Sequence, residues 1–147
     1  MALFLIAQIA GRTVAIESSQ VESVVDIGAI VPVPRAERQV RGLAALRSRV
    51  VTVIDTHAAL GIDAGPVAAT RAVITIVEGH HYAVLVDALD DVAPFDLAPL
   101  SAGIVLDKGW RMIGRGLVER ANGSKGGEPI LAIALDALIP GVTALAA

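Results

Sequence analysis

The amino-acid sequence predicts a mainly β protein made of two small, similar lobes, each a closed sheet, with only short helices. A series of short β-branched runs, bounded by Gly, Pro, Asp or Asn, is typical of strands. Helical periodicity is weak throughout the chain. The chain also repeats itself once, and two closed sheets accommodate a duplicated β unit without leaving open edges.

Six strands are expected, and four of them form two hairpins. Ala10-Gly11-Arg12 separates the first pair, and Glu78-Gly79-His80-His81 separates the second. Glycine supplies the positive φ that such turns require. The expected strands are 3–9, 13–16, 50–54, 72–77, 82–86 and 130–135, and short helices are expected at 56–61 and 135–139. The segment 121–127 is expected to be an exposed turn.

An alignment of Gly11 with Gly79 relates the two halves of the chain, because the residues that follow are similar. Gly42, followed by the strand 50–54, likewise corresponds to Gly116, followed by the strand 130–135. Internal repetition at this spacing indicates a duplicated architecture. We therefore expect one domain, residues 1–147, of two lobes that interleave near residues 61–71, with a groove where they meet.

The composition limits the function classes that need considering. A chain of 147 residues that is 54% hydrophobic can bury a core without a staple. The absence of cysteine excludes disulfides and thiolate nucleophiles, which fits a reducing compartment, and we expect a cytoplasmic protein. A net charge of −3 and 3% aromatic residues argue against nucleic acid as a partner.

Two apolar segments could suggest a membrane, but neither is long enough to cross one. The apolar start is interrupted at Gln8, and the tail contains Asp136 and is broken at Pro140-Gly141. A membrane-spanning helix needs ~20 unbroken apolar residues. We therefore expect no direct membrane insertion.

No catalytic constellation is present, so we expect no enzyme and no cofactor. His80 and His81 are adjacent, and adjacent residues of a strand point to opposite faces, which disfavours a shared metal ion. The acids of segment 87–91 and the side chain of His57 are expected to be solvated. The alternative is a small metal- or ligand-binding domain that uses His80, His81 and the 87–91 cluster.

Val21, Val24 and Val25 alternate with acidic residues, and Arg47 precedes the strand 50–54. Apolar residues ringed by charge suit a protein contact, and a guanidinium can reach a partner carboxylate. Alternatively, the three valines belong to the core and Arg47 pairs with a nearby acid. The residue pattern alone leaves both interpretations open.

Segment 42–55, Gly-Leu-Ala-Ala-Leu-Arg-Ser-Arg-Val-Val-Thr-Val-Ile-Asp, resembles the stretch of the CheW-like family whose usual form is G-x-x-N-L-R-G-x-x-x-P-V-x-D-L-R. It departs from that form at Ala45, Ser48, Thr52 and Thr56-His57, where Asn, Gly, Pro and Leu-Arg are usual. The resemblance extends over nearly the whole chain. Further segments that resemble the family are the opening hairpin at 4–16, the turn at 31–34, the second-lobe hairpin at 71–87 and the closing strand and helix at 130–138.

The resemblance implies a pair of five-stranded SH3-like barrels and a non-enzymatic adaptor of bacterial chemotaxis. Proteins of this family couple the cytoplasmic tips of methyl-accepting chemoreceptors to the histidine kinase CheA, whose regulatory domain has the same fold. The implied location is the cytoplasm, with recruitment to membrane receptor arrays. The resemblance also implies a partner-binding set at or near the groove between the lobes, namely Val21, Val24, Val25, Gly42, Arg47 and Val73.

Overall fold

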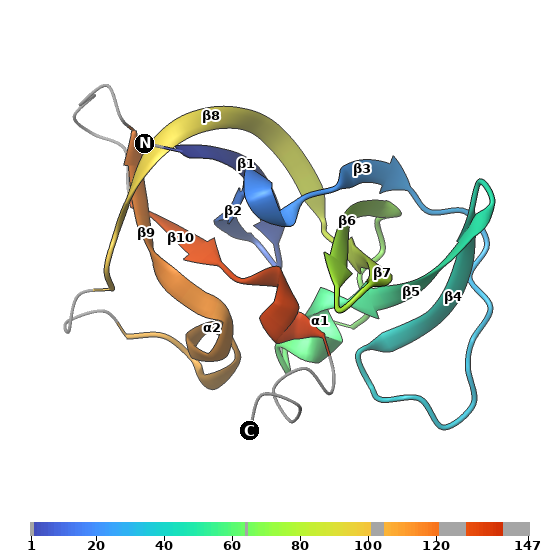
Figure 1. Cartoon of the computed structure of the whole chain (residues 1–147). Coiled ribbons are helices and arrows are strands. Elements are labelled where there is room, and N and C mark those ends of the chain that lie inside the picture. Colours follow the sequence, from blue (N-terminus) through green and yellow to red (C-terminus); the bar gives the residue numbers. More distant parts are fainter. Residues whose placement is uncertain (1, 64, 101–104, 121–128, 140–147) are drawn as a thin grey trace.

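The computed structural model describes residues 2–63, 65–100, 105–120 and 129–139 and contains two five-stranded sheets (Figure 1). The barrel lobe contains β1 (Ala2–Ile9), β2 (Arg12–Glu17), β8 (Ala88–Ala98), β9 (Gly114–Arg120) and β10 (Ile130–Ile133). The sheet lobe contains β3 (Ser23–Asp26), β4 (Val40–Leu46), β5 (Arg49–Asp55), β6 (Arg71–Val77) and β7 (His80–Leu85). The helices are α1 (Thr56–Ala59), α2 (Lys108–Ile113) and the 3₁₀ turns η1 (Ser18–Gln20) and η2 (Leu135–Leu138).

These elements confirm the mainly β fold with short helices. Every expected strand is present, and both predicted hairpins form with the turn glycines at a φ of 80°. Four strands were not predicted, namely β3, β4, β8 and β9. The sequence of β8 obscures its strand character because it contains several aspartates and a proline. The expected turn at 121–127 lies outside the described residues.

The two sheets differ in closure. In the barrel lobe the hydrogen-bonded order β1-β2-β10-β9-β8 closes on itself. In the sheet lobe the order is β3-β6-β7-β5-β4, and among the described strands this ladder ends at β3 and β4. A short bridge between Val31 and Leu43 covers part of the β4 edge. The prediction of two five-stranded sheets is therefore confirmed, whereas the described hydrogen-bond ladder closes only in the barrel lobe.

The two repeats exchange their hairpins. The hairpin β1–β2 pairs with β8 and β10, and the hairpin β6–β7 pairs with β3 and β5, so each lobe combines strands from both halves of the chain. The equivalent contacts β2–β10 and β7–β5 are both parallel. The chain crosses between the lobes around η1 and again at the junction of β7 and β8. The interleaving of the lobes near residues 61–71 stays a prediction.

A hydrophobic core lies between the lobes and joins them. Fully buried residues from β2, β5 and β10, such as Ile16, Ile54 and Ile133, meet there with Trp110 of α2. Each lobe also encloses a smaller core, and Phe4 packs edge to face against Phe95 inside the barrel lobe. Burial of apolar surface between the sheets holds the two lobes as one unit.

Candidate functional site: a groove between the lobes

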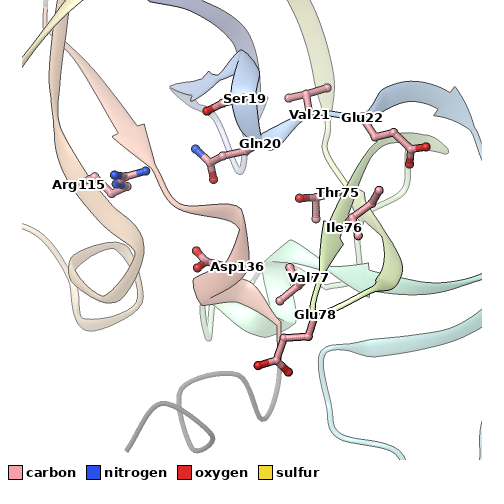
Figure 2. Close-up of a pocket in the computed structure, with 10 residues that line it drawn as sticks. All are labelled: Ser19, Gln20, Val21, Glu22, Thr75, Ile76, Val77, Glu78, Arg115 and Asp136. Carbon is pink, nitrogen blue, oxygen red and sulfur yellow. The ribbon is translucent and has the colours of Figure 1, made fainter.

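A groove of about 590 Å³ opens between the two lobes, beside η1 (Figure 2). Its apolar part comes from Val21, which follows η1, and from Ile76 and Val77 of β6. Ile76 is 49% exposed, whereas Val21 and Val77 pack partly against the core between the lobes. The lining residues are Ser19, Gln20, Val21, Glu22, Thr75, Ile76, Val77, Glu78, Arg115 and Asp136.

The rim of the groove carries more negative than positive charge. Glu22, Glu78 and Asp136 supply carboxylates, and Arg115 of β9 supplies a guanidinium on the barrel-lobe side (Figure 2). The Glu22 carboxylate lies 3.3 Å from Nε2 of His81. The excess of carboxylates favours a ligand segment with basic side chains.

Gln20 fixes the position of η1 at the edge of the groove. Its Nε2 donates to the Ile133 carbonyl at 3.2 Å, and its Oε1 accepts from the Leu135 N–H at 2.7 Å. One side-chain amide thereby ties η1 to the end of β10 and the start of η2. On the other wall, the Glu22 N–H donates to the Ile74 carbonyl at 2.8 Å and holds the chain against β6.

The four valines predicted for the partner site lie in four different environments. Val21 lines the groove, and Val24 of β3 is 37% exposed. Val25 is half-buried and packs against the core of the sheet lobe. Val73 lies directly opposite Val24 in the β3–β6 ladder but is fully buried in the core between the lobes. The side chain of Val73 therefore offers no exposed area to a partner, and its place in the partner-binding set stays a prediction.

Gly42 and Arg47 do not lie in the groove either. Gly42 is buried in β4 with a φ of 147°, and its position serves packing against Val31. Arg47 is exposed in the β4–β5 turn with a φ of 56°. Figure 1 shows this turn on the side of the sheet lobe that faces away from the barrel lobe. Arg47 is therefore not among the residues that line the groove, and its part in partner binding stays a prediction.

Arg47 instead adjoins an exposed apolar strip that the sequence analysis missed. Ala45 faces Val50 across the β4–β5 ladder, and Leu43 faces Val31 across the adjacent bridge. Val50 is 63% exposed and Val31 is 66% exposed. Residues directly opposite each other share one face of a sheet. We call Val31, Leu43, Ala45 and Val50 the outer strip. The alternation of Val50 and Thr52 outward with Val51 and Val53 inward could have indicated it.

Asp55, which directly follows the predicted strand 50–54, has a structural role. Asp55 is buried and caps α1 by accepting the Ala58 N–H at 3.2 Å. Its Oδ2 also accepts the Val67 N–H at 3.1 Å and lies 3.2 Å from Nη1 of Arg41. Arg41 donates in addition to the Val67 carbonyl at 2.9 Å. These bonds bind the segment after α1 to β4 and β5.

His57, expected at the surface, is only 6% exposed. Its Nδ1 lies 2.9 Å from the Gly65 carbonyl, and its Nε2 lies 2.9 Å from Oδ2 of Asp87. Burial lowers the pKa of His57, but the hydrogen bonds to Asp87 and Gly65 and the charges of Asp87 and Asp55 outweigh burial. The pKa is therefore raised above the ordinary value of 6.5.

Three residues of the metal-binding alternative, His81, Asp87 and Asp90, have other partners. His81 contacts Glu22 and the Arg49 guanidinium, while Asp87 contacts His57. Asp90 accepts from the Gln8 side-chain amide at 2.9 Å. Within the described ranges, no three His, Asp or Glu side chains converge in a way that could hold an ion. The geometry therefore does not support this alternative.

The described part of the chain contains no helix with the length and apolarity to cross a membrane. Its two β lobes, with a charged groove between them and an exposed apolar strip on the sheet lobe, define a two-lobed β domain. The family model of the CheW-like domain matches residues 3–142, and the chain belongs to this family. Membership of this family supports a scaffold role in chemotaxis signal transduction.

A solved structure with the same fold is the scaffolding protein TtCheW from Thermoanaerobacter tengcongensis. The TM-score is 0.77 at 21% sequence identity, and the alignment covers 95% of this chain and 92% of that chain. At this identity the match shows the fold alone. A comparison with curated proteins gave no significant match.

Proposed function

We propose that this chain is a non-enzymatic adaptor that couples chemoreceptors to a CheA-type histidine kinase, acting in the cytoplasm at receptor arrays. The observation that carries the proposal is that one chain presents two separate surfaces, the groove between the lobes and the outer strip of β4 and β5. An adaptor needs two such surfaces, because it must hold two partners at once. Isothermal titration calorimetry with each partner separately tests the two surfaces.

The groove suits the helical tip of a chemoreceptor. Helices dock in grooves by inserting apolar side chains between polar rims. Val21, Ile76 and Val77 provide the apolar part, and the carboxylates beside them favour basic residues on the incoming helix. Binding through this rim should weaken with ionic strength, since exposed charges are screened by salt.

The outer strip suits the regulatory domain of the kinase. Val31, Leu43 and Val50 form an exposed apolar area on the outside of a sheet, which is typical of a protein contact surface. The family resemblance implies that the kinase domain has the same two-lobed β fold and can offer a sheet face in return. Arg47, in the adjoining turn, is placed to pair with a carboxylate of this partner.

The first prediction concerns the groove. Ile76→Glu should weaken binding of a receptor-tip fragment by about 2 kcal/mol, because it replaces an apolar contact with a charge of the same sign as the rim. The matched control is Val92→Glu, since Val92 of β8 is also about half exposed, at 56%, and lines neither surface. Calorimetry should show equal affinity for the control and the wild-type chain. Equal affinity for Ile76→Glu would exclude the groove as the receptor site.

The second prediction concerns the outer strip. Val50→Glu should weaken binding of the kinase regulatory domain by about 2 kcal/mol, and Arg47→Ala should weaken it less, because rim charges contribute less than buried apolar contacts. Both variants should bind the receptor-tip fragment normally. The proposal for the strip fails if Val50→Glu binds the kinase domain as tightly as Val92→Glu does.

A further inference from the structure

His57 and Asp87 join three segments of the chain across the boundary between the lobes. His57 lies in α1, which follows β5 of the sheet lobe, and Asp87 lies where the chain passes from β7 into β8 of the barrel lobe. Asp87 Oδ2 accepts from His57 Nε2 at 2.9 Å and from the Ala10 N–H, in the β1–β2 turn, at 2.6 Å. One carboxylate oxygen therefore connects α1 of the sheet lobe with a turn of the barrel lobe.

The protonation state of His57 decides whether this connection is complete. Both ring nitrogens face oxygen acceptors, the Gly65 carbonyl at 2.9 Å and the Asp87 carboxylate at 2.9 Å. A neutral imidazole has only one N–H, so one nitrogen would direct its lone pair at an oxygen. Only the imidazolium donates to both acceptors. Because the side chain is 8% exposed, water cannot easily replace a lost partner.

The charges around the His57 ring favour the imidazolium form. Asp87 and, at the end of β5, Asp55 act on the ring as negative charges, and Arg41 of β4 pairs with Asp55. The segment after α1 presents the Gly65 carbonyl, and the β1–β2 turn presents the Ala10 N–H, which donates to Asp87. Loss of the proton from His57 would leave Asp87 without its cation at a partly buried site.

We propose that His57 and Asp87 form a proton-dependent clamp between the two lobes, which is closed while the imidazole carries two protons and loosens when it loses one. The sign of the pH effect follows from the raised pKa of His57. The clamp contributes its full stability below pH 6.5, and that contribution is lost as the pH rises through the raised pKa.

The clamp bears on the groove because the walls of the groove come from both lobes. Ile76 belongs to the sheet lobe and Arg115 to the barrel lobe. Looser coupling between the lobes should therefore make the width of the groove vary and weaken the binding of a ligand that contacts both walls. This consequence rests on the proposed function, whereas the clamp itself can be tested without any partner.

The test uses the absence of natural cysteines in the chain to place two spin labels. Ser48→Cys in the β4–β5 turn and Glu119→Cys in β9 put one label on each lobe, at exposed positions outside the groove. Double electron–electron resonance measures the distance between the labels at about pH 5.5 and about pH 8.5, on either side of the histidine titration. The distribution should be narrow at the lower pH and broader at the higher pH.

Two variants connect this change to the clamp. His57→Gln and Asp87→Asn should each give the same distance distribution at both pH values, and circular dichroism checks that each variant is folded. If one variant fails to fold, the other completes the test. NMR titration of the isotope-labelled His57 imidazole should show a lower pKa of His57 in Asp87→Asn than in the wild-type chain. An identical distribution at both pH values in the doubly labelled parent, or a pH dependence that survives in a folded variant, would overturn the clamp.

Discussion

Gly42→Ala is expected to lower the free energy of unfolding by about 4 kcal/mol, the sum of backbone strain and a clash with a neighbouring segment. At the φ of 147° found at Gly42, the backbone of an alanine is strained even where its side chain has space. A Cβ at this position would also lie 2.3 Å from the Val31 carbonyl oxygen. Two backbone hydrogen bonds between Val31 and Leu43, of 2.8 and 2.9 Å, hold that carbonyl in place. The clash can therefore be relieved only if this bridge opens.

Gly28→Ala is the matched control, because a Cβ there has nothing within 4 Å and Gly28 has no positive φ. Its unfolding free energy should stay within about 0.5 kcal/mol of the wild-type value, as is usual for surface changes. Denaturation with urea, followed by circular dichroism, measures both variants. Equal stability of the two alanine variants would show that the Val31 bridge does not press on Gly42. Because Val31 belongs to the outer strip, Gly42→Ala should also disturb that surface.

Asp55→Ala is expected to lower the free energy of unfolding by about 3 kcal/mol, because it leaves buried donors without an acceptor. The Ala58 and Val67 N–H groups both donate to the Asp55 carboxylate, which is 3% exposed. Arg41 loses its partner as well, but it is 33% exposed and can turn towards water. The cap of α1, and with it the position of His57, should loosen.

Asp63→Ala serves as the control for this change, since Asp63 is exposed a few residues after α1. Thermal unfolding should show a clearly lower midpoint for Asp55→Ala and an unchanged midpoint for Asp63→Ala. If Asp55→Ala unfolded at the wild-type midpoint, the buried network of Asp55, Arg41 and Val67 would contribute nothing to stability.

The local features of the fold could be predicted from the sequence because they depend on local chemistry. Gly11 and Gly79 mark the hairpin turns, and β-branched runs mark the strands beside them. The exchange of hairpins between the repeats could not be predicted. Either arrangement would bury the same faces of the same strands, and only packing between distant segments distinguishes them.

The site was harder to predict than the fold for a similar reason. Whether His57 is buried depends on Asp87, thirty positions further along the chain, and nothing near His57 indicates that contact. Val73 and Val24 look alike in the sequence, yet one is fully buried and the other is 37% exposed. Arg115 and Asp136 line the groove although they are distant in sequence from η1 and β6, because β9 pairs with β10 and Gln20 ties η1 to the start of η2.

The proposed function requires that this chain holds two partners at once on two separate surfaces. Sedimentation velocity of the full chain mixed with a receptor-tip fragment and a kinase regulatory domain tests the claim directly. We expect a complex that contains all three proteins, from which Ile76→Glu removes only the receptor fragment and Val50→Glu removes only the kinase domain. Displacement of one partner by the other, or loss of both partners from each variant, would contradict it.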